Sequence, residues 1–191
     1  MTRDAIVHLR ADPTIGPLVE DYGDLTIEPA EDTFRRLVRS IISQQVSTAS
    51  ATAIRGRLYE SFDVTPTALL SADPEELKAV GLSRQKVEYV QNVAHAYEVR
   101  GFSRSYFADM SDGEVIDELT SIRGIGPWTA KMYLMFCLGR PDVFPIEDLG
   151  VRTGMQTLFG ESLTTLEMMD QAEPWRPYRS TASRYLWRII D

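Results

Sequence analysis

The amino-acid sequence predicts an all-α protein of about ten helices joined by short connections. Helix-capping and turn residues punctuate the chain at helical intervals, and apolar residues recur between them at helical spacing. Only Leu25–Ile27 has the pattern of a β-strand, and this segment is short. The chain has 191 residues, 43% of them hydrophobic, which is enough to bury a sizeable core.

Start and stop signals define the helices in the middle of the chain. Asp73 and Pro74 suit the N-cap and the first helical position, and Gly81 ends that helix. Ser83 begins the next helix, in which apolar residues recur at helical spacing until Gly101 closes it. Two connected helices are therefore expected between residues 73 and 101.

The second half of the chain carries equally clear helix signals. Ser111–Glu114 and Thr164–Glu167 both have the form of a capping box. A largely apolar helix is expected over Pro127–Leu138, closed by Gly139, and a further helix over Leu149–Phe159.

The helices are expected to form two lobes. The central stretch, about 48–135, and the two flanking segments each carry apolar faces of their own. Residues 1–32 are expected to be an N-terminal extension that packs on the core, and residues 33–191 to form the main fold. A cleft between two such lobes is a common place for a substrate.

The chain contains no apolar run near the length of a membrane span and no leader-like segment. We therefore expect a cytoplasmic protein without a membrane partner. Its single cysteine, Cys137, lies in an apolar run and is expected to be a buried hydrophobic side chain. One cysteine also excludes a disulfide framework and an iron–sulfur cluster, which needs about four thiolates.

The charge of the chain is segregated. The net charge of −8 argues against nucleic acid as a ligand, because phosphate binding relies on Lys and Arg. However, the arginine-containing segments 34–59, 119–141 and 175–190 have no acidic residue, whereas eight acids lie in the first 32 residues. Such segregation can give an acidic protein a basic face. The alternative is that the three segments lie on different faces and their effects cancel.

A glycine-rich turn between two expected helices is the first candidate site, in the sequence Ile122-Arg123-Gly124-Ile125-Gly126-Pro127. Gly124 and Gly126 permit positive φ and leave no Cβ in the way of a ligand. Pro127 suits the start of the following helix, whose free N–H groups and the Thr129 hydroxyl would form an anion site. A plain tight turn is the alternative, but the wider pattern L-x-x-I-x-G-I-G-P-x-T-A favours phosphate binding.

The second candidate site is the carboxylate of Asp148, twenty-two residues past Gly126 and directly before the helix expected from Leu149. A helix N-terminus stabilises negative charge, so a carboxylate there is held in its ionised form. An ordinary N-cap is the alternative role for this aspartate. Glu147 is the rival carboxylate within the same loop, and Asp142 is a more distant one.

These motifs together resemble a known family. Beside the hairpin and the Asp148 loop stand Ile41–Ser47, Leu77–Leu82 and Trp175–Ser180, in the order and at the separations seen in the helix-hairpin-helix DNA glycosylases. Within this superfamily the chain is most similar to the 3-methyladenine DNA glycosylase II group, from about Thr33 onward. The cleft between the lobes would then bind DNA.

The resemblance implies a base-excision repair enzyme that flips an N-alkylated purine, such as 3-methyladenine or 7-methylguanine, out of the duplex and removes it by hydrolysis. It assigns Asp148 as the catalytic carboxylate, which would stabilise an oxocarbenium-like transition state or orient a water at C1′. Bifunctional members carry a lysine two residues after the second glycine, where this chain has Trp128. The enzyme is therefore expected to be monofunctional and to leave an abasic site.

The base pocket is expected to be aromatic. The electron-rich indole of Trp128 would attract a cationic alkylated base. Met132 stands where some relatives have a pocket tyrosine, and Tyr178 and Trp175 are further candidates for the pocket wall. Trp187 is a further candidate for the pocket wall, but a core position in the last helix is the favoured expectation for it.

The family's intercalating residue matches Gln45, which would fill the gap left by the flipped base; a polar turn between helices is the alternative reading. Arginine and lysine side chains near these motifs are expected to contact the DNA backbone. The residues expected to contact DNA are Gln45, Gly124, Gly126, Thr129, Lys131, Arg39 and Arg84.

No cofactor is expected to be required. Hairpins of this family often bind a monovalent cation through backbone carbonyls, which by position would be those of Thr120, Ile122 and Ile125. The expected partner is double-stranded DNA with alkylated bases, acted on by a monomer at the nucleoid.

Two alternatives stand beside this hypothesis. One is a non-catalytic helix-hairpin-helix DNA-binding module, against which the matched positions of Asp148, Trp128 and Gln45 argue. The other is a glycosylase for another damaged base, such as a mispaired adenine or an oxidised purine. The absence of cluster cysteines and of the hairpin lysine argues against it.

Overall fold

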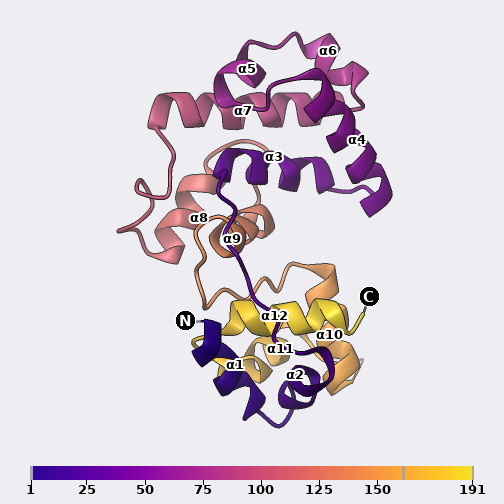
Figure 1. Cartoon of the computed structure of the whole chain (residues 1–191), viewed down its shortest axis with the longest axis vertical. Coiled ribbons are helices and arrows are strands. Elements are labelled where there is room, and N and C mark those ends of the chain that lie inside the picture. Colours follow the sequence, from indigo (N-terminus) through magenta and orange to yellow (C-terminus); the bar gives the residue numbers. More distant parts are fainter. Residues whose placement is uncertain (1, 161, 191) are drawn as a thin grey trace. The chain divides into compact units, whose positions relative to one another are not determined.

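The computed structural model describes residues 2–160 and 162–190, and every regular element in these residues is a helix (Figure 1). They form twelve α-helices and one short 3-10 helix, which confirms the all-α prediction. The count exceeds the expected ten by two; α5 (Pro66–Ser71) is one short helix that the sequence signals did not mark, whereas α6 (Pro74–Ala79) lies where a helix was expected. The weak strand candidate Leu25–Ile27 has no regular structure.

Local capping chemistry places the helices where the sequence predicted them. The side chains of Asp73 and Ser83 accept a hydrogen bond from the first turns of α6 and of α7 (Arg84–Arg100). Ser111 and Thr164 form complete capping boxes with Glu114 and Glu167. Burial of apolar faces then stabilises helices that would be marginal in isolation.

The chain divides into two compact units. The central unit is residues 30–133. The split unit is formed by residues 1–29 and 134–191, which are distant in sequence. The central unit therefore starts earlier than the expected residue 48, because α3 packs against α4 and α7 and so belongs to it.

The central unit is organised around α7, against which α3, α5 and α6 pack. Leu37, Val38 and Ile41 of α3 and Val90 and Val93 of α7 are almost fully buried. The helices of this unit are α3 (Thr33–Ser43), α4 (Thr48–Ser61), α5, α6, α7, α8 (Asp112–Thr120) and the first part of α9 (Pro127–Phe136). The first part of α9 is included because the unit ends at Tyr133.

The split unit is organised around α12, which packs against α1, α2 and α10. Its core includes Leu9, Val19, Trp175 and Tyr185. The Tyr185 hydroxyl ties the N-terminal segment to α12, because it donates to the Gly23 carbonyl and accepts from the Leu25 N–H. The helices of this unit are α1 (Thr2–Arg10), α2 (Gly16–Tyr22), the end of α9, α10 (Leu149–Phe159), α11 (Thr165–Gln171), the 3-10 helix η1 (Glu173–Trp175) and α12 (Arg179–Arg188).

None of the helices in the described part of the chain combines the length and the hydropathy that a bilayer crossing requires.

Candidate active site

The hairpin of the central unit is a six-residue turn, 121–126, between α8 and α9. Gly124 has φ +109°, a conformation that L side chains rarely adopt, and a Cβ there would lie 2.2 Å from the ring of Tyr89. Gly126 does not have positive φ, so its backbone conformation is open to other residues. A Cβ at Gly126 would meet nothing within 4 Å. Gly124 is thus required by the fold, whereas Gly126 leaves open space beside the start of α9.

The hairpin is closed by apolar packing and by the first turn of α9. Ile122 and Ile125 are 5% exposed and Ala130 is fully buried. The Ala130 N–H donates to the Gly126 carbonyl, which is the first intrahelical bond of α9. The first turn of an α-helix is a place where backbone N–H groups can bind an anion, and the turn leads directly into it.

Thr129 is placed differently from its expected DNA-facing position. Its side chain is 1% exposed, and its hydroxyl accepts a hydrogen bond from Gln44 Nε2 at 3.0 Å. The same Nε2 donates to the Gly124 carbonyl at 3.1 Å. Thr129 therefore stabilises the hairpin from inside, and Gln44 is a residue of the site that the sequence did not reveal.

Gln45, the expected wedge, follows α3 in an exposed turn. Its φ of 55° makes it the one non-glycine residue with positive φ in the described part of the chain. Such a conformation is costly for a residue with a Cβ and persists only where the surroundings hold it. The backbone thus presents this side chain to solvent at an energetic cost, which is common at functional positions.

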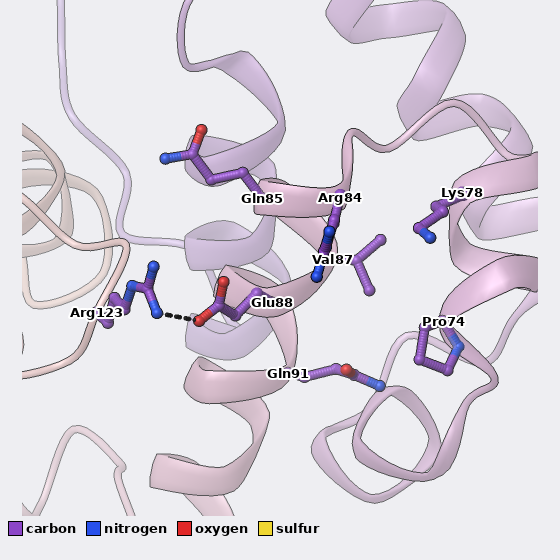
Figure 2. Close-up of a pocket in the computed structure, with 8 residues that line it drawn as sticks. All are labelled: Pro74, Lys78, Arg84, Gln85, Val87, Glu88, Gln91 and Arg123. Carbon is purple, nitrogen blue, oxygen red and sulfur yellow. Dashed lines mark hydrogen bonds and ion pairs between the residues drawn. The ribbon is translucent and has the colours of Figure 1, made fainter.

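The basic residues of the central unit differ in their environment. Arg39 on α3 and Arg84 at the start of α7 are exposed, and Lys131 on α9 is partly buried. Arg84 lines a surface pocket of about 740 Å³ between α6, α7 and the hairpin turn, shown in Figure 2. Arg123 lies at one side of this pocket, where it pairs with Glu88.

In the split unit, Asp148 is the N-cap of α10. Its Oδ1 accepts two hydrogen bonds, from the Val151 N–H at 3.0 Å and from Trp187 Nε1 at 2.8 Å. The Trp187 ring is in turn stacked on Phe136, with ring centroids 6.0 Å apart. Asp148 is therefore an N-cap residue, which was the alternative role. The same two hydrogen bonds fix the position of its carboxylate, and a catalytic carboxylate would also need a fixed position.

Trp187 was expected in the core, and it packs against the core of the split unit without being fully buried. The residue is only partly buried, and its indole N–H donates a hydrogen bond to Asp148. Gly150 explains how the ring fits, because a Cβ at that position would lie 2.8 Å from Trp187 Cδ1 and 3.0 Å from Asp148 Oδ1. Gly150, two residues after Asp148, is the sequence feature that is consistent with a bulky side chain packed close to this backbone.

The rival carboxylates have distinct surroundings. Glu147 is exposed. Asp142 is bound by two arginines: Arg176 Nη1 lies 2.6 Å from its Oδ2, and Arg179 Nε lies 2.7 Å from its Oδ1. Both arginines also pair with Glu173. Asp142 is therefore a structural ion-pair partner, and these two arginines do not add to a basic face as segment 175–190 suggested.

The candidates for the base pocket lie on both units. Trp128 is partly buried and Met132 is 5% exposed, one turn apart on the same face of α9. Tyr178 packs edge-on against His8, with ring centroids 5.4 Å apart. Trp175 is 1% exposed within the core of the split unit, so it is a core residue.

The carbonyls suggested for a cation belong to the end of α8 and the hairpin turn. The Ile122 carbonyl accepts the Ile125 N–H at 3.0 Å and retains a second lone pair. The carbonyl of Thr120 ends α8, where the helix dipole is negative. These groups suit a cation by their chemistry.

Comparison with known proteins gives the family. The model of the HhH-GPD superfamily of base excision DNA repair proteins matches residues 38–177. The Bacillus subtilis protein YfjP is 30% identical over 92% of this chain and 62% of its own length, so the chain spans somewhat less than two thirds of that relative. DNA-3-methyladenine glycosylase 1 of Schizosaccharomyces pombe is 31% identical, over 90% of this chain and 78% of its own length.

The fold gives the same result. A solved structure of a Schizosaccharomyces pombe 3-methyladenine DNA glycosylase in complex with abasic DNA matches with a TM-score of 0.88 and 30% identity, over 97% of this chain and 95% of that chain. The resemblance found in the sequence motifs is thereby confirmed. The chain belongs to the HhH-GPD superfamily of base excision DNA repair proteins.

Proposed function

We propose that this protein is a monofunctional DNA glycosylase that removes N-alkylated purines, such as 3-methyladenine and 7-methylguanine, and leaves an abasic site. The observation that carries the proposal is the double anchoring of the Asp148 carboxylate by Val151 and Trp187. Relatives that bear the name 3-methyladenine DNA glycosylase support the substrate class.

The chemistry requires negative charge beside C1′, where positive charge develops as the glycosidic bond breaks. The electron pair of that bond leaves with the base, and a base alkylated at a ring nitrogen is already cationic, so it departs neutral. Water then adds to C1′ and releases a proton to the carboxylate or to solvent. We assign Asp148 to this site, because two N–H donors hold its charge at a helix start.

Trp128 is the proposed contact for the flipped base, because an indole face attracts a cationic purine. Met132 on the same helix face and Tyr178 of the split unit are further wall candidates. Since Trp128 occupies the position two residues after Gly126, where a lyase of the family carries its lysine, we assign no Schiff-base step to this protein.

Double-stranded DNA with alkylated bases is the proposed substrate, bound by a monomer in the cytoplasm at the nucleoid. The start of α9 and the open space at Gly126 suit a DNA phosphate, and the strained, exposed Gln45 suits a wedge. The exposed Arg39 and Arg84 suit contacts to the sugar-phosphate backbone.

A monovalent cation at the carbonyls of Thr120, Ile122 and Ile125 would strengthen the phosphate contact. Its test is the affinity for duplex DNA in potassium chloride and in tetramethylammonium chloride at equal ionic strength. Weaker binding in the second salt supports the cation, and equal affinity contradicts it.

Asp148→Asn tests the catalytic assignment. Asparagine is as good an N-cap as aspartate, so the melting temperature and the affinity for duplex DNA should stay unchanged. Release of 3-methyladenine from methylated duplex should fall by about a hundredfold or more. Chromatography of the freed base and alkali-labile strand breaks measure the release, and Glu147→Gln is the matched control.

Each part of the proposal has its own contradicting result. Full activity of Asp148→Asn with loss in Glu147→Gln would move the chemistry to Glu147. DNA binding without base release by the wild type would leave the non-catalytic DNA-binding module. Release of an oxidised or mispaired base in place of 3-methyladenine would point to a glycosylase of different specificity.

A further inference from the structure

We propose that Gln44 is a positioning residue that joins the wedge turn, residues 43–47, to the phosphate-binding hairpin. The inference rests on the proposed function in one respect, the wedge role of Gln45. Beyond that function, the contacts of Gln44 fix the turn that carries Gln45, so that the wedge keeps its position while it is inserted in the duplex.

The Gln44 amide spans the hairpin. Its Nε2 donates to the Gly124 carbonyl at 3.1 Å and to the Thr129 hydroxyl at 3.0 Å, 80 and 85 residues further along the chain. One acceptor belongs to the turn and the other to the first turn of α9. A single NH₂ group therefore uses both of its hydrogens on the hairpin.

Helix α7 contacts both the hairpin and the end of α3, directly before the wedge turn. Lys86 Nζ donates to the Ile42 carbonyl at the end of α3, 2.6 Å away, and burial lowers the pKa of this lysine. The Tyr89 ring fills the space over Gly124, and Asn92 Nδ2 donates to the Arg123 carbonyl at 3.2 Å. The wedge turn and the hairpin thus share one platform within the central unit.

This arrangement explains how Gln45 keeps its positive φ of 55°. On one side its backbone continues into Gln44, which is tied to the hairpin. On the other side it continues to Ser47, the N-cap of α4. Flipping a base costs a few kcal/mol of lost stacking and pairing, so the wedge that replaces the base must stay in place. Fixing the wedge at a set position relative to the phosphate contact meets this need.

Gln44→Ala removes both hydrogen bonds and leaves Gln45 in place. Gln91→Ala is the matched control, because Gln91 Nε2 makes one comparable bond, to the Ala72 carbonyl, in the same unit. Figure 2 shows Gln91 among the residues that line the surface pocket. Thr129→Val removes one of the two acceptors and nearly keeps the side-chain shape. Melting temperatures establish that each variant is folded.

The first readout is single-turnover excision of 3-methyladenine from two substrates. In one the lesion is paired; in the other it lies opposite an abasic analogue, so that no orphaned base needs to be contacted. We expect Gln44→Ala to be about tenfold slower on the paired lesion, close to wild type on the unpaired one, and Thr129→Val to be intermediate. Equal loss on both substrates, or no loss on either, overturns the proposal.

The second readout is a double-mutant cycle with Gln45→Gly, which removes the wedge side chain but tolerates the positive φ. Gln44→Ala should have little further effect on paired-lesion excision in this background, because there is no wedge left to position. Full additivity of the two losses overturns the proposal.

The third readout does not depend on base excision. A 2-aminopurine opposite an abasic analogue reports insertion of the wedge by its fluorescence. The wild type and Gln91→Ala should give the same change on binding, and Gln44→Ala about half of it or less. A wild type that inserts its wedge in a Gln44-dependent way but releases no alkylated base would support this inference and contradict the proposed function. A Gln44→Ala variant that inserts normally overturns the inference alone.

Discussion

The hairpin of the central unit and the Asp148 loop of the split unit, residues 137–148, both lead into the start of a helix, but different chemistry holds them. The buried side of the hairpin is held by neutral groups, the Gln44 amide, the Asn92 amide and the Tyr89 ring, and Arg123 adds an exposed ion pair with Glu88. The Asp148 loop is held by an indole N–H and by the ion pairs of Asp142.

The difference suits the charges that each segment is proposed to meet. A helix start that binds an anionic phosphate works best without an uncompensated carboxylate nearby. No acidic residue lies in the sequence from 119 to 141, and Glu88, which lies beside the hairpin, is paired with Arg123. A loop that presents a carboxylate needs donors to stabilise that charge, and it obtains them from α10 and α12. Changes in the two segments should therefore have separable effects.

The largest effect on stability is expected from substitution of Gly124, for which Gly126 in the same hairpin is the control. Gly124→Ala forces a Cβ into the Tyr89 ring at a positive φ, so it should destabilise the protein by about 3 kcal/mol or abolish folding. Gly126→Ala meets open space and should leave stability within about 0.5 kcal/mol of wild type. Urea unfolding measures both, and equal destabilisation would contradict the distinction. Weaker binding of duplex DNA by Gly126→Ala alone would identify its open space as the place of phosphate approach.

Next in size is Trp187→Phe, which removes the N–H donor and keeps an aromatic ring against Phe136. A hydrogen bond to a charged group contributes about 2 kcal/mol, so excision should slow by about tenfold or more with little loss of stability. Trp175→Phe is the control for a core tryptophan, and it should lower the melting temperature but spare the rate below it. Wild-type excision by Trp187→Phe would show that the indole does not orient Asp148.

A smaller effect is expected from Asp142→Asn. This variant weakens the pairing with Arg176 and with Arg179, whose side chain is only 12% exposed. The loss should be about 2 kcal/mol in urea unfolding, less at high salt. The exposed pair of Arg10 and Glu20 is the control, since Glu20→Gln should cost less than about 0.5 kcal/mol. Equal costs would mean that the partly buried cluster adds nothing to the loop.

The smallest effect is expected from the two capping boxes, one in each unit. Hydrogen bonds from Ser111 and Thr164 lower the pKa of Glu114 and of Glu167 below the ordinary value of 4.5. Each folded-state pKa lies below the unfolded one, so the stabilisation is present above about pH 4.5 and lost as the pH falls. Glu114→Gln and Glu167→Gln should each flatten the fall in unfolding free energy between about pH 6 and pH 3.5. Glu60→Gln, on the exposed face of α4, should leave it unchanged.

The sequence predicted features whose cause is local. The capping boxes at Ser111 and Thr164, the start of α10 at Asp148 and the closure of α7 at Gly101 depend on residues within one turn of each other. The turn before Pro127 and the helix start after Asp148 were likewise read from neighbouring residues, and the structure has a helix start at both places.

The sequence could not predict contacts that folding creates between distant segments. Gln44 reaches Gly124 across 80 residues and Trp187 reaches Asp148 across 39, and no periodicity or cap encodes such pairs. The same limit explains the error about segment 175–190, where two arginines are paired with Asp142 from another part of the chain. The difference between Gly124 and Gly126 depends on the Tyr89 ring, which lies on α7.

The division of the split unit between two distant segments has a consequence for the order in which the two units can fold during translation. Residues 30–133 form the central unit from one continuous stretch, so it can fold as soon as it has left the ribosome. Residues 1–29 must wait, because their partners Tyr185 and α12 are translated after residues 30–133. Asp148 also gains its indole donor only then. In a nascent chain the proposed phosphate-binding hairpin would therefore form before Asp148 gains its hydrogen bond from Trp187.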